Sequence, residues 1–506
     1  MSPAKNSSEP EKDFVSQLAH TFEWLITAFV LAFVFRAFVM EAFRIPTGSM
    51  ADTLMGNHYR IRCSQCGYEY EYGFTPQRYG LPRNAVPEGA VKKPVSRCPS
   101  CGHYQAGGSL PVSKGDRILV LKFIYQFFEP KRWDVVVFKN PRDPALNYIK
   151  RLIGKPGETV EIIDGDIYID GEIARKPAKV QQKLWQAVYD DDYTPTRPSD
   201  GVFNGHRWRR PFNFGSSDWQ PVSGRPNRFR LETEMSNQFS SLKYESDVGN
   251  SFRVAYAYND IDMYEYQPFC SDLMINYYFE LVSRKARIGA AIEKYGTTYL
   301  GWFDSVSNEI VVAKKEEGEG VVKLKSKQVP TLPRRPVRFE FADVDHLLLL
   351  RVGDEKLKYD LGKEPDTLDN SSRQRSPEVS IIGQGNLVVS HTGIYKDIYY
   401  TSQNFYGNGE KGFATEGNPL TLDQGQYFVL GDNSPSSEDG RWWDEKGIGN
   451  NGKRYRAGIV PQEYLVGKAL FVYWPSGFKP FKGFKLHIIP NVGKMRFIYG
   501  GSADSL

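Results

Sequence analysis

Cysteine, histidine and net charge are all scarce in this sequence, and each scarcity excludes a class of protein. The 506 residues include five cysteines, too few for a disulfide-scaffolded fold, and seven histidines scattered along the chain. The formal net charge of +5 is small for this length and argues against a nucleic-acid partner. Hydrophobic residues make up 40% and charged residues 25%, as in globular proteins. The aromatic share of 14% favours strands over helices.

Long apolar runs are scarce too, because only one reaches the length of a membrane span. From Thr21 to Met40 the sequence is mostly apolar, with Glu23 and Arg36 near the two ends, where long side chains can reach the bilayer surface. We predict a transmembrane helix over residues 21–41, preceded by a disordered tail over 1–20. The basic start and small-residue cleavage site of a cleavable signal peptide are both absent. A buried core helix is the alternative, and the flanking charges leave the orientation undecided.

Four of the five cysteines form two Cys-x-x-Cys-Gly units, at Cys63 and Cys66 and at Cys98 and Cys101. Two such knuckles supply four thiolates for tetrahedral zinc, and each glycine permits the tight turn behind its pair. The pattern predicts a zinc-ribbon-like insert over residues 63–108 with a structural zinc ion. Disulfides are the alternative in an oxidising compartment. His103 could replace a ligand, but we expect it to be solvated.

The remaining sequence is typical of antiparallel strands. Short apolar runs between Arg117 and Gly171 alternate with turn residues, as in consecutive hairpins. Residues 178–265 lack periodicity, and no fold is predicted for them. From Met274 onward the strand spacing favours a β-sandwich. The predicted fold class is therefore mainly β: an N-terminal transmembrane helix followed by an antiparallel β domain, which is interrupted by the zinc-ribbon-like insert and a β-sandwich-like insert.

Two runs in the second insert, Arg338–Ala342 and Lys396–Tyr400, resemble those of concanavalin-like and laminin-G-like jelly rolls. The resemblance implies a lectin-like insert over residues 266–420, whose partner would be a carbohydrate or a protein. Exposed aromatic side chains could stack on a sugar there, although packing in the core is their commoner use.

A serine follows the membrane-length run closely, in the stretch from Ile45 to Met50. A nucleophilic serine needs a base, and since no histidine lies near another catalytic signal, Lys150 is the better candidate. Alternate residues of a strand share a face, which places Lys150 with Tyr148 and Leu152. Apolar neighbours lower the pKa of a lysine by desolvation, so that it can accept a proton near neutral pH. Taken alone, such a lysine is usually solvated and such a serine usually a turn residue.

Four segments taken in order closely resemble the motifs of bacterial type I signal peptidases, which are membrane-anchored serine–lysine proteases that remove signal peptides from exported proteins. The segments are Pro46–Met50 with Thr53 and Leu54, Gly115–Val120, Tyr148–Arg151 with Gly154–Gly157, and Gly431–Asn433. The match covers residues 21–62, 109–177 and 421–480. It implies a catalytic β domain made of 42–62, 109–177 and 421–480, followed by a C-terminal tail over 481–506.

The resemblance assigns roles by position. Ser49 would be the nucleophile and Lys150 the general base, while the Ser49 backbone N–H and the Thr47 hydroxyl would stabilise the oxyanion. No cofactor is implied for catalysis. The supporting residues would be Arg151, Ser437, which orients the lysine ammonium, and Asp439 and Arg441, which form a salt bridge. Asp432 and Asn433 are expected to shape a turn.

The sequence departs from the family at two places. The Arg-Asp-Asn that follows Gly-Asp-Asn in the family is Ser434–Ser436 here, and the frequent Glu-Pro after Ser-Met is Ala51–Asp52. These changes affect loop shape rather than the nucleophile or the base.

Partners and location also follow from the resemblance. It implies exported preproteins as substrates, cut after small residues in an Ala-x-Ala pattern. It further implies a single-pass protein in the lipid bilayer of the bacterial cytoplasmic membrane, with its N-terminus in the cytoplasm and its catalytic domain outside.

Two other classes are open at the level of sequence. A soluble serine–lysine self-cleaving repressor would share this β domain, but the membrane-length run beside Ser49 and the lack of a basic DNA-reading helix argue against it. A membrane-anchored carbohydrate-binding protein on an inactive peptidase core is the other alternative. The presence of both Ser49 and Lys150 argues against that class.

Overall fold

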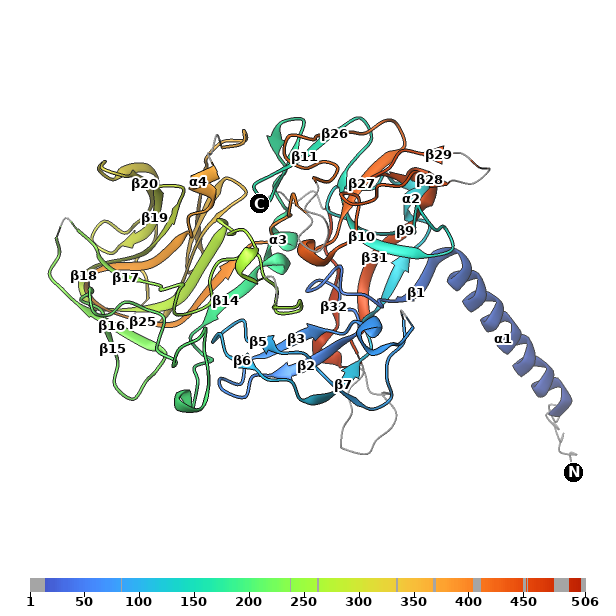
Figure 1. Cartoon of the computed structure of the whole chain (residues 1–506), viewed down its shortest axis with the longest axis horizontal. Helices are drawn as coiled ribbons and strands as arrows, with labels where there is room; N and C mark the ends of the chain where they lie inside the picture. Colours follow the sequence, from blue (N-terminus) through green and yellow to red (C-terminus); the bar gives the residue numbers. More distant parts are fainter. Residues whose placement is uncertain are drawn as a thin grey trace, which may run out of the picture.

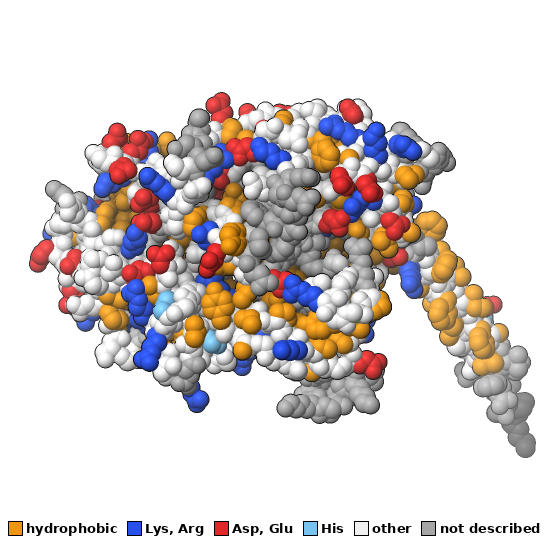
Figure 2. All heavy atoms as spheres, viewed as in Figure 1, with side chains coloured by type: hydrophobic (Ala, Val, Ile, Leu, Met, Phe, Trp, Pro, Cys, Tyr) orange, Lys and Arg blue, Asp and Glu red, His pale blue; other side chains and the backbone are white. Residues whose placement is uncertain are grey.

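The computed structural model describes residues 14–501 apart from 83, 237, 262–263, 334, 367–369, 404–410, 449–451, 453 and 477–490. Strands dominate, and every strand pairing between named elements is antiparallel, which confirms the mainly β fold class. Figure 1 shows one long helix outside a body of sheets, and Figure 2 shows acidic and basic side chains interspersed over the visible face of that body.

The apolar run forms helix α1 (Phe14–Val34), which projects from the body (Figure 1). A π-helical turn (Phe35–Val39) ends it, and β1 (Met40–Arg44) begins directly afterwards. The helix therefore begins and ends earlier than predicted, and residues 14–20 are not disordered; residues 1–13 lie outside the described part. The stretch Ser16–Val34 is long and apolar enough to cross a membrane and has no buried residue, which argues against a core helix.

Lys150 lies in the larger of two neighbouring sheets, while Ser49 lies in the loop that follows β1, outside both sheets. The larger has the order β1-β8-β31-β9-β10-β27-β30, with β32 beside β31, and the smaller has the order β13-β12-β11-β26. Their bounds are β8 (Arg117–Leu121), β9 (Val135–Lys139), β10 (Asn147–Gly154), β11 (Thr159–Ile163), β12 (Asp166–Ile169), β13 (Glu172–Ile173), β26 (Leu420–Thr421), β27 (Gln426–Leu430), β30 (Val460–Pro461), β31 (Leu465–Trp474) and β32 (Arg496–Phe497).

Strand β9 explains why this part of the sequence reads as a continuous apolar run. Val136 and Phe138 pack into one hydrophobic core, while Val135 and Val137 pack into a second core on the opposite face. A strand buried on both faces needs no polar alternation. Its neighbour β10 is buried from Lys150 onward, so the lysine side chain is enclosed by the protein.

The zinc-ribbon-like region builds its own sheet, of order β3-β2-β7-β4. Strands β2 and β7 lie outside the predicted range of 63–108 but pair with strands inside it, so this sheet extends further than the predicted insert. The bounds are β2 (His58–Arg62), β3 (Glu69–Gly73), β4 (Ala90–Lys92) and β7 (Ser109–Ser113), with a separate ribbon of β5 (Ser96–Arg97) and β6 (Tyr104–Gln105).

The second insert folds around two long strands, β18 (Leu273–Lys294) and β25 (Glu378–Lys396), which pair along most of their length. Their register shifts between Leu281 and Ala286, and such irregularities bend a sheet around its core. The other strands are β19 (Thr297–Asp304), β20 (Glu309–Glu316), β21 (Val322–Gln328), β22 (Val337–Val344), β23 (Leu347–Val352) and β24 (Glu355–Asp360).

Strands from residues 178–265 join this same sheet, so the expected division at residue 265 is not a boundary in the structure. β14 (Gln186–Asp190), β16 (Arg228–Glu232) and β17 (Ser240–Lys243) all pair with β25, and β15 (Gln220–Pro221) pairs with β16. Phe229 and Leu231 of β16 are fully buried in the core of the insert.

The short helices are α2 (Ile124–Phe127), α3 (Ala178–Leu184) and α4 (Asn370–Arg373), and β28 (Gly447–Ile448) pairs with β29 (Arg454–Tyr455).

The predicted tail over 481–506 is wrong for residues 491–501, which pack against the larger of the two sheets. β32 pairs with β31, and the Arg496 guanidinium donates to the Asp116 carboxylate and to the Thr53 carbonyl, each at 2.8 Å. Ile498 is buried in one core with Ile45. This segment therefore supports the loop that carries Ser49.

Candidate active site

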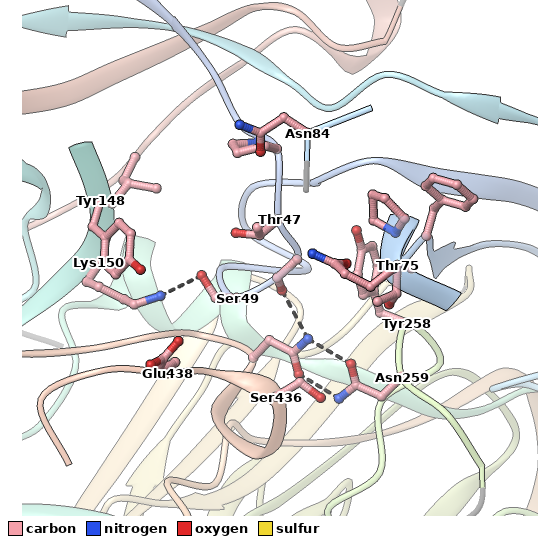
Figure 3. Close-up of a pocket in the computed structure, with 18 of the residues that line it drawn as sticks. Thr47, Ser49, Thr75, Asn84, Tyr148, Lys150, Tyr258, Asn259, Ser436 and Glu438 are labelled. Atoms are coloured by element: carbon pink, nitrogen blue, oxygen red, sulfur yellow. Dashed lines mark hydrogen bonds between the residues drawn. The ribbon is translucent and has the colours of Figure 1, made fainter. Parts of the chain in front are cut away.

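The structure brings Ser49 and Lys150 together from distant parts of the chain. Ser49 lies in the loop between β1 and β2, and Lys150 lies in the middle of β10. The Lys150 Nζ donates a hydrogen bond to the Ser49 Oγ at 2.5 Å, as Figure 3 shows. Lys150 is 3% exposed, so its ammonium has been removed from water.

Burial decides the protonation of Lys150. Desolvation is the largest influence and lowers the pKa of Lys150 to about 8, against an opposing effect of the Asp439 and Glu438 carboxylates. A lysine with such a pKa is partly neutral near pH 8 and can then accept a proton from a hydroxyl. The sequence argument from apolar neighbours anticipated this direction.

The Ser49 loop is held at its base by the Gly115–Asp116 segment. The Ile45 N–H donates to the Asp116 carbonyl (2.8 Å), and the Asp116 N–H donates to the Met55 carbonyl (2.9 Å). A side chain at Gly115 would place its Cβ 1.8 Å from the Ile45 carbonyl oxygen, so only glycine permits this close approach. The glycine of this motif therefore permits the packing that supports the Ser49 loop.

The Gly431–Asn433 loop holds the other side of the Ser49 loop. The Asn433 Nδ2 donates to the Gly48 carbonyl at 3.0 Å, and the Asn433 N–H donates to the Ser49 carbonyl at 3.1 Å. A Cβ at Gly431 would lie 2.4 Å from the Ser49 carbonyl oxygen. The expectation that Asn433 only shapes a turn is therefore incomplete, because its side chain also contacts the Ser49 loop.

Arg151 forms a buried ion pair with Asp432. The two guanidinium nitrogens Nε and Nη2 donate to the Asp432 carboxylate at 2.7 and 2.6 Å, and both side chains are at most 2% exposed. The Thr53 hydroxyl also donates to Asp432. Sequence reasoning missed this role of Asp432, which follows the apolar run of β27 after a single glycine.

Asp439 and Arg441 form a second buried ion pair, at 2.8 Å between Arg441 Nη2 and Asp439 Oδ2. Burial alone would raise the pKa of Asp439, but the Arg441 guanidinium holds it below its usual value. Arg441 also donates to the Thr401 carbonyl at 2.7 Å. The Asp439 carboxylate accepts from the Gly431 N–H at 2.9 Å, so this pair supports the loop that contacts Ser49.

Neither Ser437 nor Thr47 forms a side-chain hydrogen bond to Ser49 or Lys150 among the described residues. The Ser437 side chain is buried and its Oγ has no partner in the described part of the chain. Its predicted contact with the Lys150 ammonium is therefore not formed in this structure. Thr47 is exposed and lines the cleft beside Ser49.

Ser49 opens into a cleft of about 420 Å³. Leu146–Lys150 of the β10 region line one side of it. The zinc-ribbon-like region lines it with Gly73–Gln77, and the long insert lines it with Tyr258–Asp260. Sequence reasoning did not place either insert at the cleft, since neither segment carries a recognisable motif.

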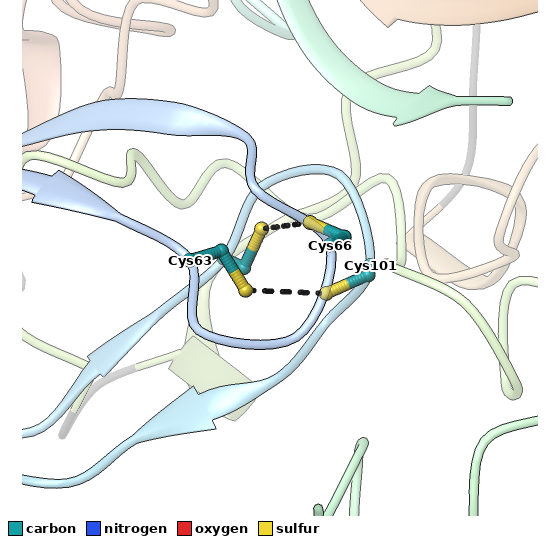
Figure 4. A group of neighbouring side chains, drawn as sticks. Cys63, Cys66 and Cys101 are labelled. Carbon is teal, nitrogen blue, oxygen red and sulfur yellow. Dashed lines mark hydrogen bonds between the residues drawn. The ribbon is translucent and has the colours of Figure 1, made fainter. Parts of the chain in front are cut away.

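The four paired cysteines gather at one point, as Figure 4 shows. Their sulfur atoms all lie within 4.8 Å of one another, with 3.7 Å between Cys63 and Cys101 and 3.6 Å between Cys66 and Cys98. Zn–S bonds of about 2.3 Å in a tetrahedron would separate sulfurs by about 3.8 Å. The spacing of the four sulfur atoms therefore fits a tetrahedral metal ion.

His103 is not solvated, contrary to expectation. It is 8% exposed, its ring lies against Phe203, and its Nδ1 lies 3.2 Å from the Val202 carbonyl oxygen. The histidine therefore joins the knuckle to residues of the long insert rather than taking part in the cysteine cluster.

Comparisons with known proteins agree with the motifs. Residues 108–211 and 369–474 match the family model of signal peptidase, peptidase S26. The likeness to the signal peptidases is confirmed. The matched segments include Lys150, Arg151, Ser437, Asp439 and Arg441.

Curated relatives named signal peptidase I match part of the chain. The protein from Rickettsia canadensis is 34% identical over 150 residues, which are 29% of this chain and 42% of the relative. The protein from Rickettsia prowazekii is 34% identical over 145 residues, which are 28% of this chain and 40% of the relative. The chain thus spans less than half the length of the curated relatives it matches.

Among solved structures, sheep galectin-11 in complex with glycerol matches this chain with a TM-score of 0.19 and 12% identity. The match covers 25% of this chain and 92% of the galectin. The exoplasmic/lumenal domain of VIP36 matches with a TM-score of 0.25 and 10% identity. That match covers 43% of this chain and 99% of the VIP36 domain. Scores this low add nothing to the description of the insert from its own strands.

The buried pair of Arg151 and Asp432 can be tested by stability. We expect Arg151→Ala to lower the free energy of unfolding by about 3–5 kcal/mol, because it leaves a buried carboxylate without its counter-charge. Urea unfolding of the detergent-solubilised protein measures the change. Lys363→Ala, which breaks an exposed pair with Glu172, should cost at most about 1 kcal/mol. Equal losses in the two variants would contradict the prediction.

Proposed function

We propose that this protein is a membrane-anchored signal peptidase that removes signal peptides from exported preproteins by serine–lysine catalysis. The contact between Ser49 Oγ and the buried Lys150 Nζ carries the proposal, together with the cleft that opens at this pair. The match to the peptidase S26 family supports the same reaction class.

The geometry supports a complete acyl-transfer cycle. Neutral Lys150 accepts the Ser49 hydroxyl proton while the Oγ attacks the scissile carbonyl. The Ser49 N–H and the Thr47 hydroxyl stabilise the oxyanion. The Lys150 ammonium then gives its proton to the leaving amine, whose C–N bond breaks, and the ester remains on Ser49. Water then attacks the ester carbonyl while it gives a proton to Lys150. The ester C–O bond breaks, the acyl product leaves as a carboxylic acid, and the Lys150 ammonium returns its proton to the Ser49 Oγ.

The apolar helix α1 supports a membrane location for the substrate as well as for the enzyme. Its last residue, Val34, precedes Ser49 by 15 residues in sequence, and its side chains are exposed throughout the described part. In the proposed topology α1 crosses the bacterial cytoplasmic membrane once, the N-terminus is cytoplasmic and both inserts lie outside with the catalytic domain. A signal peptide held in the same bilayer could then enter the cleft beside Thr47.

Cleavage of a preprotein tests the proposed activity. We expect the protein extracted from washed membranes with detergent to cut after an Ala-x-Ala sequence. Ser49→Ala and Lys150→Ala should each lower kcat at least about 10²-fold, since one removes the nucleophile and the other the base. Lys155→Ala removes a partly exposed lysine from the turn after β10 and should retain activity.

Three results would contradict different parts of the proposal. Undiminished cutting by the Ser49 and Lys150 variants would exclude the mechanism. Equal cutting of substrates with a phenylalanine in place of either alanine would exclude the specificity for small side chains. Recovery of the full chain in the soluble fraction without detergent would exclude the anchor.

The pH dependence should report the ionisation of Lys150. Because the base must be neutral, kcat/KM should rise with pH below about 8 and level off above it, following the lowered pKa of Lys150. Lys150→Arg should be inactive throughout, since a guanidinium does not lose its proton in this range. The measurement is the rate of peptide cleavage between about pH 6 and about pH 10. An inflection retained in the arginine variant would assign the ionisation to another group.

We also propose a structural zinc ion at the four cysteines. Elemental analysis of the purified protein should find one zinc per chain, and Cys98→Ser should lose it. Cys270→Ser is the matched control, because Cys270 is buried outside the cluster. Cleavage should weaken on zinc loss, because the same region supplies Gly73–Gln77 to the cleft. Two disulfides found by mass spectrometry under non-reducing conditions would contradict the metal.

A further inference from the structure

One loop of the long insert reaches the loop of the nucleophile. The Tyr258 ring packs so closely on Gly48 that a Cβ there would lie 2.1 Å from it. The Tyr258 hydroxyl donates to the Asn57 carbonyl (3.0 Å), and the Tyr258 carbonyl accepts from the Gly73 N–H (2.8 Å). Figure 3 shows Tyr258 and Asn259 on the side of the Ser49 loop away from Lys150.

The next residue, Asn259, forms a reciprocal amide pair with Asn433. The Asn259 Nδ2 donates to the Asn433 Oδ1 at 2.7 Å, and the Asn433 Nδ2 donates to the Asn259 Oδ1 at 2.8 Å. The second hydrogen on the Asn433 Nδ2 goes to the Gly48 carbonyl. Both hydrogens of this amide are therefore used, and Asn259 fixes the direction in which the other points.

The Gly48 carbonyl is part of the peptide unit that ends in the Ser49 N–H. A trans peptide is planar, and its C=O and N–H point in opposite directions. The Gly48 carbonyl accepts from Asn433 Nδ2 and from the Ala51 N–H, both at 3.0 Å. Holding this oxygen sets the direction of the Ser49 N–H, for which no hydrogen bond is found within the described residues.

We propose that Asn259 is a positioning residue for the oxyanion site. Through Asn433 it fixes the Gly48–Ser49 peptide, so that the Ser49 N–H is oriented before the substrate arrives. This inference rests on the proposed peptidase function and adds to it that the long insert is a working part of the active site. Without Asn259 the buried Asn433 amide lacks two partners and can turn away from Gly48 to replace them.

Substitution of Asn259 tests the inference. In the full-length, detergent-solubilised protein, Asn259→Ala should lower kcat about 10- to 100-fold and leave KM nearly unchanged, since a misdirected oxyanion donor weakens binding of the transition state only. Asn259→Asp keeps the size and the acceptor oxygen but cannot donate to Asn433, so it should also lose kcat. It replaces the alanine variant if that one does not fold.

A control variant distinguishes the positioning role of Asn259 from a general role in holding the long insert against the zinc-ribbon-like region. Arg78→Ala removes the ion pair between Arg78 and Asp260, the residue after Asn259, and should leave kcat within about twofold of wild type. Hydrogen exchange provides a readout that is independent of turnover. The amides of residues 48–51 should exchange faster in Asn259→Ala than in Arg78→Ala.

The outcomes distinguish the inference from the proposed function. If Asn259→Ala matches wild type in kcat and exchange while Ser49→Ala is inactive, the inference fails and the peptidase function stands. A rise in KM alone would also overturn it, because Asn259 would then contact the substrate directly. If folded wild-type protein cuts no preprotein, both the function and the oxyanion role fail.

Discussion

The buried ammonium of Lys150 is the constraint on which the rest of the site depends. Desolvation favours its neutral form, while a nearby carboxylate favours its charged form. Asp439 lies close enough to act on Lys150, yet Arg441 binds that carboxylate directly. The acidic residue can therefore hold the Gly431 loop without restoring the full basicity of the lysine. In the proposed mechanism, this balance explains why a buried ion pair stands beside a lysine that must be neutral to act as a base.

The Ser49 loop must bring its hydroxyl to that immobile lysine, and the loop has no regular structure of its own. It is held from the Asp116 side, from the Asn433 side and from the Tyr258 side. Each support comes from a segment distant in sequence, so the Ser49–Lys150 contact forms only when the separate parts of the chain have folded together. The glycines at 48, 115 and 431 allow these segments to approach the loop within contact distance.

The sequence predicted those parts of the protein that have a local signal. Residue type and periodicity indicated the apolar helix, the hairpins after Arg117 and the cysteine knuckles, and the motif order indicated the pairing of Ser49 with Lys150. The strands β14, β16 and β17 escaped prediction because they are short and are completed by β25; Phe229, for example, pairs with Val389. The contact of Asn259 with Asn433 has no local signal either, since an asparagine in a polar loop is ordinary and its partner lies far along the chain.

The junction between the long insert and the catalytic sheets argues that the insert is not a loosely tethered module. Lys176, which follows β13 of the smaller sheet, is buried between the Asp345 and Asp397 carboxylates of the long insert. Removing charges from water is costly, and the cost is offset only when the partners meet in the right geometry. Other placements of the insert would leave some of these charges buried without a partner. A single placement of the insert is what the Asn259 contact requires, because an amide pair can orient a peptide only if its own backbone stays fixed. The same buried charges would thus support the proposed active site indirectly, because they hold the Tyr258–Asn259 loop in its position against Gly48.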